Sequence, residues 1–140
     1  MRMRILNFAA FVTGILGSSI AAADFDGTEP LICSFGHVIE CVSGSQCVAV
    51  SNDKVDAPDF VKLDFRKKQI VSTTGGEDSP ASEINVTDLI THLIVQGNQG
   101  SGQGDALGYS LSIDKATGQL AVAGAGENAG FVIFGACTTN

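Results

Sequence analysis

The chain has 140 residues with eight basic and fifteen acidic side chains, 44% apolar residues, four cysteines and no tryptophan. This length suits a single small domain, and the acidic excess argues against nucleic-acid binding, which needs a basic surface. A protein that crosses the membrane several times is also excluded, because only one apolar stretch approaches the length of a membrane span.

Residues 1–23 have the pattern of a cleaved secretory signal peptide. Two arginines precede an apolar core over 5–17, and an Ala-x-Ala sequence ends at Ala23, as signal peptidase requires. The core is shorter than the roughly 20 apolar residues of a membrane anchor. Cleavage predicts a single mature domain over 24–140 that has no membrane anchor, with six basic and fifteen acidic side chains and a net charge of −9.

In the mature chain the apolar residues alternate with polar ones at a period of two, which predicts strands rather than helices. The linker 51–58 has room for one helical turn, and 114–118 predicts a hairpin in which Gly118 adopts a positive φ. We count eight or nine strands joined mostly by short turns, so that sequential strands pair antiparallel. The clearest strand segments are 32–42, 60–65, 69–74, 83–87, 109–114, 120–122 and 131–136.

These segments predict an all-β fold: a small antiparallel meander barrel, with a two-layer β-sandwich as the alternative. The segments 32–42 and 131–136 are partly apolar on both faces, which predicts strands covered on both sides. A small barrel either fills its interior with side chains or holds one small ligand, and the sequence leaves both possibilities open. The residues expected to face inward are Val61, Leu63, Phe65, Ile84, Val86, Tyr109, Leu111, Ile113, Leu120 and Val122.

The four cysteines all lie in the mature chain, and an even number in a small exported protein predicts two disulfides. Of the three possible pairings we favour Cys41–Cys47, which closes a short Ser-Gly turn, together with Cys33–Cys137, which joins the first strand to the last. The cysteine spacing does not match a zinc site, and pairing disfavours a catalytic thiol. We therefore expect no metal.

Two segments of the mature chain repeat one pattern. Residues 102–109 and 124–131 both place glycines, an acidic residue and then an aromatic residue in the same order, 22 residues apart. This offset is about one hairpin, so the second copy is expected two strands away from the first. The repeat indicates either two similar loops that each enter a strand through an aromatic residue, or a paired ligand rim at one end of a barrel.

Known catalytic and cofactor motifs are missing from the sequence. The glycine-rich segment 97–108 lacks the lysine of a phosphate-binding loop and precedes a strand, so we interpret it as a surface loop. His37 is expected to share a face with Cys33 and Phe35, and both it and His92 are interpreted as core or edge imidazoles bonded to the backbone. We expect no catalytic residue and no cofactor, and the alternative is a small hydrolase that uses His92 and an acid.

The segment 111–120, followed by Gly-Phe-Val-Ile-Phe-Gly-Ala-Cys-Thr at 130–138, resembles the ending of a family of small exported proteobacterial proteins. This resemblance implies a periplasmic or extracellular location and implies no mechanism. The Ser-Gly loop between Cys41 and Cys47 is similar to that of periplasmic lysozyme inhibitors, which are small disulfide-bonded β-barrels. The aromatic and basic residues that follow the Ser-Gly in those inhibitors are absent here, where Gln46 and Cys47 stand.

Taken together, these features predict an exported, non-enzymatic binding protein of the periplasm or cell exterior. The partner is expected to be a cationic protein or a small ligand, and one specific form of the hypothesis is an acidic inhibitor of a cationic enzyme. A structural component of the cell envelope is the other alternative, and the oligomeric state is left open. The candidate partner contacts are Ser43, Gly44, Ser45, Asp105 and Glu127.

Overall fold

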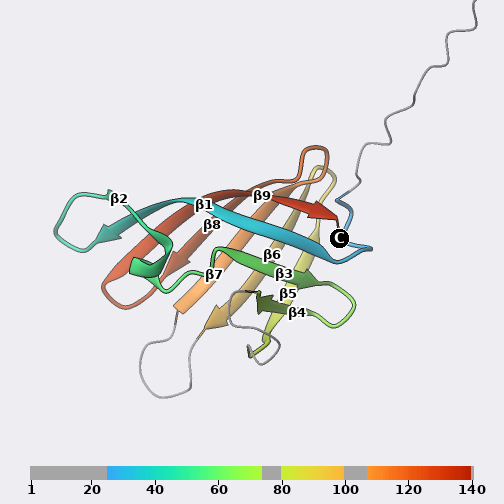
Figure 1. Ribbon diagram of the computed structural model, residues 1–140, viewed down its shortest axis with the longest axis horizontal. Helices are drawn as coiled ribbons and strands as arrows, with labels where there is room; N and C mark the ends of the chain where they lie inside the picture. Colours follow the sequence, from blue (N-terminus) through green and yellow to red (C-terminus); the bar gives the residue numbers. More distant parts are fainter. Residues whose placement is uncertain (1–24, 74–79, 100–106, 140) are drawn as a thin grey trace, which may run out of the picture.

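The computed structural model describes residues 25–73, 80–99 and 107–139 (Figure 1). The predicted all-β class is confirmed, since these residues form strands and a single 3₁₀ turn. The elements in chain order are β1 (Leu31–Val42), β2 (Val48–Val50), η1 (Asn52–Val55), β3 (Phe60–Asp64), β4 (Gln69–Ser72), β5 (Ser82–Asp88), β6 (His92–Gln99), β7 (Leu107–Asp114), β8 (Gln119–Ala125) and β9 (Ala129–Thr139).

The strands close into an antiparallel barrel. From β3 to β9 each strand pairs with the next one in the chain, and β1 pairs with β3 on one edge and with β9 on the other. Eight of the described strands thus form a ring in which β1 and β9 run side by side (Figure 1), and the short β2 pairs with Val38–Glu40 at the far end of β1. Because the strands close into a ring, the fold is the predicted meander barrel and not the alternative two-layer sandwich.

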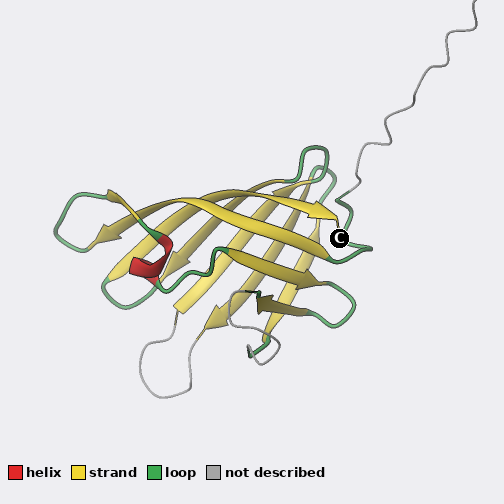
Figure 2. Ribbon diagram, in the orientation of Figure 1, coloured by secondary structure: helices red, strands yellow, loops and turns green. Residues whose placement is uncertain are grey.

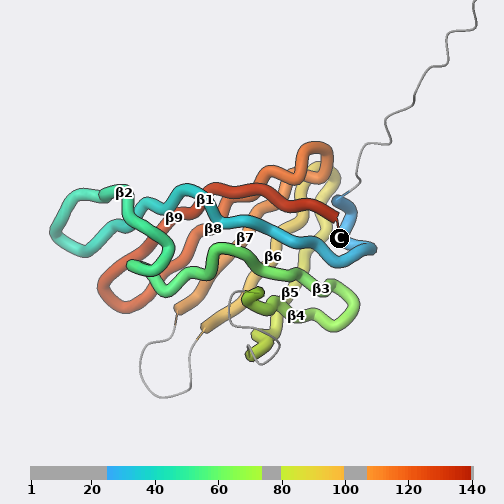
Figure 3. Tube along the Cα trace, in the orientation of Figure 1, coloured from blue at the N-terminus to red at the C-terminus, as the bar shows by residue number. Residues whose placement is uncertain are grey.

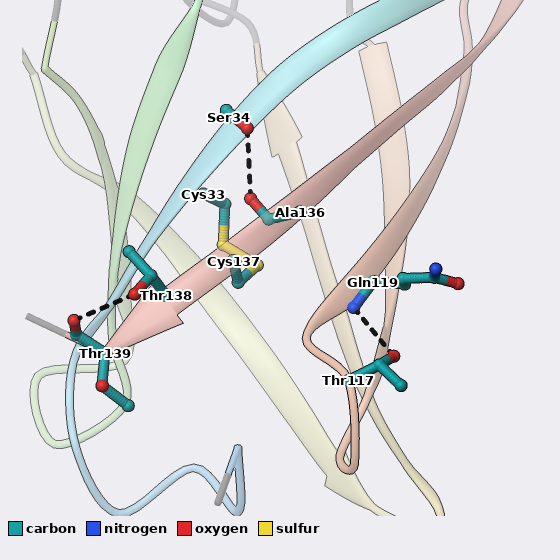
Figure 4. Close-up of a disulfide and its surroundings, with 8 residues drawn as sticks. All are labelled: Cys33, Ser34, Thr117, Gln119, Ala136, Cys137, Thr138 and Thr139. Carbon is teal, nitrogen blue, oxygen red and sulfur yellow. Dashed lines mark hydrogen bonds between the residues drawn. A yellow bond between two sulfur atoms is a disulfide. The ribbon is translucent and has the colours of Figure 1, made fainter. Parts of the chain in front are cut away.

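Both predicted disulfides are present. Cys33 and Cys137 are direct register partners on β1 and β9, and their bond joins two residues 104 positions apart (Figure 4). Beside it, the Ser34 hydroxyl donates a hydrogen bond to the carbonyl of Ala136 at 3.3 Å. Cys41–Cys47 spans six positions and fastens the turn between β1 and β2. The Cys33–Cys137 disulfide thus links β1 and β9, the two strands whose pairing closes the barrel.

The inward faces follow the predicted alternation with one exception. Ile84 is buried, but Val86 on the same face of β5 is 37% exposed, so the expectation of two buried side chains there is wrong. The pairing of β5 with β4 ends at Glu83 and Gln69, and no β4 residue covers the rest of this strand. The residues confirmed as buried are Val61, Leu63, Leu111, Ile113, Leu120 and Val122, and Phe65 and Tyr109 pack partly buried against them.

A β-bulge in the middle of β1 changes which side chains of this strand point into the barrel. The register with β9 shifts between Phe35 and His37, and Cys33 and Val38 on either side of it are both buried. His37 therefore points outward, and its expected place on the face of Cys33 is wrong. The outer face is also uncovered, because the Phe134 side chain is 48% exposed, so these strands are not covered on both sides.

The predicted turns are confirmed. The linker 51–58 contains η1, which lies at one end of the barrel (Figure 2), and Gly118 has a φ of +71°. A Cβ atom at Gly118 would lie 2.7 Å from the carbonyl oxygen of Cys137 and 2.6 Å from the Phe25 ring. Only glycine fits this turn, where the β7–β8 hairpin packs against the last strand and the start of the domain.

Candidate functional site

The two ends of the barrel differ in packing, and we name them the Phe25 end and the η1 end. At the Phe25 end the segment 25–30 crosses the opening, with Phe25 itself 6% exposed and Gly27 placed so that a Cβ atom there would lie 3.4 Å from the Leu93 side chain. Along β7 the inward side chains pass from fully buried Ile113 to partly buried Tyr109 as the strand approaches the η1 end. Among the described residues, the interior is therefore packed more tightly at the Phe25 end than at the η1 end.

A cavity of about 940 Å³ occupies the η1 end. Its floor consists of buried aliphatic side chains, and aromatic side chains form part of its wall. The volume lies within the range of about 300–1,000 Å³ that is typical of small-molecule sites. The floor residues are Leu111, Val122 and Ile133, and the aromatic wall residues are Phe35, Tyr109 and Phe131.

A row of alternating glycine and aromatic residues shapes the wall. Gly97, Tyr109, Gly124 and Phe131 are consecutive register partners on β6, β7, β8 and β9. A Cβ atom at Gly97 would lie 2.4 Å from the Tyr109 hydroxyl, and one at Gly124 would lie 2.3 Å from the Phe131 ring. Each ring therefore lies against the wall over a glycine instead of projecting across the cavity.

This row accounts for part of the sequence repeat. Tyr109 and Phe131 lie two strands apart at the same end of the barrel, as the 22-residue offset predicts, and both line the cavity. Residues 102–106 of the first copy lie outside the described residues. Residues 97–99 belong to β6 and 107–108 to β7, so the interpretation of 97–108 as a loop is wrong at both ends; residues 100–106 lie outside the described part of the chain.

The segment that contains η1 is tied to the bulge of β1 at the cavity mouth. The Asn52 side-chain amide donates to the carbonyl of Phe35 at 3.0 Å and to Oδ1 of Asp59 at 2.9 Å. The backbone N–H of Phe35 donates to the carbonyl of Asp59 at 2.8 Å. These bonds hold both ends of the segment, so its side chains form a fixed part of the rim.

The rim carries negative charge. Asp53, Asp56 and Asp59 line the cavity and are exposed, whereas the described lining residues include no lysine, arginine or histidine. Asp56 has a φ of +50°, a left-handed conformation that aspartate and asparagine tolerate better than most residues. The site thus combines an apolar floor with an acidic edge.

The Tyr109 hydroxyl is buried beside Gly97, and it has no hydrogen-bond partner within the described parts of the chain. Burial raises the pKa of this phenol above its ordinary value, because the charged phenolate would lose its hydration. The ring contributes apolar surface to the cavity, while its polar atom points into the wall.

Neither histidine reaches the cavity. His37 is exposed on the outer face of β1, and the His92 side chain is 42% exposed at the Phe25 end. The Nδ1 atom of His92 lies 2.9 Å from the Thr91 hydroxyl, and its Nε2 atom lies 3.8 Å from a carboxylate oxygen of Asp114, beyond hydrogen-bond length. The expectation of core or edge imidazoles bonded to the backbone is wrong for both.

Asp114 has its own local role. The hydroxyl and backbone N–H of Thr117 bond its carboxylate at 2.8 Å each, with a further bond from the Ala116 N–H, and these bonds lower the pKa of Asp114. Such a carboxylate stabilises the β7–β8 turn. A hydrolase that pairs His92 with this acid gains no support from the geometry.

The candidate partner contacts gather at the η1 end, apart from Asp105, which lies outside the described residues. Ser43, Gly44 and Ser45 are exposed in the disulfide-bonded turn, and the backbone N–H of Ser43 donates to the carbonyl of Asn128 at 2.9 Å. The β8–β9 turn that contains Asn128 also carries exposed Glu127. Figure 3 shows the β1–β2 hairpin extending beyond the ring of strands.

The sequence interpretation missed the acidic rim and the role of the glycine–aromatic row. Three aspartates at intervals of three residues, two within the linker 51–58 and one directly after it, were the available signal for the acidic rim. Gly97 and Gly124 inside alternating segments were a signal for close approach by another side chain. The partners of these glycines depend on strand register, which the sequence alone does not supply.

Among the residues that the structure describes, no group of three or more His, Cys, Asp or Glu side chains is placed to hold a metal ion. No helix in the described part of the chain has the length and apolar character that crossing a membrane requires. Comparisons of the chain with family models, with curated proteins and with solved structures found no match.

Proposed function

We propose that the protein is an exported binding protein that holds one small, largely apolar molecule in the η1 end of its barrel. The observation that carries this proposal is the cavity of about 940 Å³ above a floor of buried aliphatic side chains. A small barrel that needed its interior only for stability would fill this volume with its own side chains. Apolar pockets of this size are the usual sites of small-molecule binding.

Two features support export. The pattern of residues 1–23 is that of a cleaved signal peptide. Both disulfides are of the kind that persists in oxidising compartments such as the periplasm. We place the mature domain in the periplasm or outside the cell.

The chain provides its own reporter for a binding test. Tyr109 is the only tyrosine, there is no tryptophan, and its ring lines the cavity. Titration with the apolar dye N-phenyl-1-naphthylamine is expected to increase dye emission and to quench tyrosine fluorescence in one saturable step. Absence of saturable binding would refute the proposal.

A matched pair of variants locates the dye. Ala57→Phe adds a ring at a residue that lines the cavity and is expected to weaken dye binding. Ala123→Phe adds the same ring at an exposed position of β8 outside this cavity and is expected to leave binding unchanged. Equal effects of the two substitutions would place the dye elsewhere.

A protein partner is the second candidate, and it is favoured by the joined turns at the η1 end. The Ser43–Asn128 hydrogen bond and the Cys41–Cys47 disulfide hold an exposed loop in a defined position, which suits recognition of another protein. Titration of a cationic lysozyme with the purified mature domain tests inhibition directly. Loss of lytic activity at equimolar protein is expected, and unchanged activity rejects this candidate.

A further inference from the structure

We infer that the cavity selects amphipathic cations, molecules in which an apolar or aromatic body carries an ammonium or guanidinium group. This inference rests on the proposed function and specifies its ligand class. It follows from the juxtaposition of an apolar, partly aromatic interior with a rim whose charged side chains in the described residues are all acidic.

The interior suits the body of such a molecule. Leu111, Val122 and Ile133 line the floor and are each 3% exposed or less, so a molecule that enters the cavity meets the apolar core of the barrel. The rings of Tyr109 and Phe131 lie against the wall over their partner glycines. Aromatic rings in this arrangement provide apolar surface, and their faces also attract cations.

The rim suits the charged group. Asp53, Asp56 and Asp59 line the cavity, whereas Lys54 from the same segment is not among the lining residues. An anionic ligand would meet three like charges there without a basic partner among the described lining residues. A cationic group would gain attraction beside an apolar surface, where charge interactions are less screened than in bulk water.

The position of Asp59 strengthens this assignment. Its Oδ1 atom accepts a hydrogen bond from the neutral amide of Asn52 at 2.9 Å, which orients the carboxylate without neutralising its charge. The same amide is fixed to the carbonyl of Phe35 on β1. The Asp59 carboxylate is thus held at the rim by an uncharged group that does not compete with a cationic ligand for its charge.

The test compares probes that share one aromatic body and differ in charge. Calorimetric titration of the mature domain uses 1-naphthylmethylammonium, 1-naphthalenemethanol and 1-naphthaleneacetate. We expect the cation to bind at least about tenfold more tightly than the anion, with the alcohol between them. Added salt is expected to reduce this difference, because exposed charges are screened.

The outcomes separate the two claims. If none of the probes binds and the apolar dye also fails, the proposed function is wrong. If the dye and the probes bind but the cation and the anion bind equally well, the cavity is a binding site and the inference of cation selectivity is overturned.

Variants distinguish the rim from the overall negative charge. Asp53→Asn with Asp56→Asn removes two rim charges, and asparagine tolerates the left-handed backbone at residue 56. We expect this double variant to weaken cation binding about tenfold and to weaken binding of the alcohol much less. Glu29→Gln with Asp88→Asn removes the same charge at the Phe25 end, and an equal loss of affinity there would overturn the assignment to the rim.

Discussion

The Tyr109 ring lies directly over Gly97, its register partner on the neighbouring strand, so that a methyl group at residue 97 would stand 2.4 Å from the phenol oxygen. Phe131 and Gly124 repeat this relationship two strands away, since a methyl group at residue 124 would stand 2.3 Å from the Phe131 ring. The open interior of the barrel therefore depends on two positions that have no side chain.

The first prediction concerns these glycines. Gly97→Ala or Gly124→Ala is expected to push the facing ring into the cavity, which weakens binding of N-phenyl-1-naphthylamine and destabilises the fold by about 1–3 kcal/mol. Gly108→Ala is the control, because a Cβ atom there meets nothing within 4 Å. Dye titration and urea unfolding measure the two effects, and equal behaviour of all three variants would contradict the role of the row.

The second prediction concerns the buried hydroxyl of Tyr109. Since this group has no partner among the described residues, Tyr109→Phe is expected to stabilise the domain by on the order of 1 kcal/mol in urea unfolding followed by circular dichroism. A loss of stability would show that the hydroxyl is hydrogen-bonded in solution.

The same variant gives a third prediction, on alkaline pH. The folded pKa of Tyr109 lies above the unfolded value of 10.0, so the fold favours the neutral phenol. The contribution of the buried neutral phenol to stability is expected to be fully present below pH 10 and to be lost as the pH rises from there through the folded pKa. Tyr109→Phe is expected to show a shallower alkaline decline, and identical pH profiles would contradict this expectation.

The fourth prediction compares the two disulfides. Replacing Cys33 and Cys137 by alanine opens a loop of 104 residues, and the chain-entropy model expects a loss of about 4–5 kcal/mol. The same change at Cys41 and Cys47 opens a six-residue loop, with an expected loss of about 2 kcal/mol. Urea unfolding of both double variants measures the difference, and a larger loss for the short loop would contradict closure at the β1–β9 seam.

The fifth prediction concerns acid stability. Hydrogen bonds from Thr117 and Ala116 lower the folded pKa of Asp114 below its ordinary value of 3.8, so the contribution of the ionised carboxylate is present above that pH and is lost as the pH falls through the folded pKa. Asp114→Asn is expected to be less stable than the wild type at neutral pH, with the difference disappearing in acid. Glu83→Gln, at an exposed carboxylate on β5, is the control and is expected to change little at either pH.

The sequence was sufficient to predict the fold class, the number of strands to within one and both disulfides. These predictions succeeded because the period of two along segments such as 109–114 is a local property, and because the end-to-end pairing of Cys33 and Cys137 agrees with a closed meander. The Gly118 turn was predictable for the same reason, since its φ is set by a few neighbouring residues.

Only the tertiary structure decided which part of the interior stays open. The bulge after Phe35, the exposure of Val86 and the placement of Tyr109 over Gly97 all depend on how strands align with their neighbours. The acidic segment reaches the cavity because Asn52 bonds to Phe35 at the bulge of β1, 17 residues away. A sequence indicates which side chains alternate, but the register between separate strands determines which of them meet. In the described part of this chain, that register leaves a cavity at the η1 end with three carboxylates at its edge.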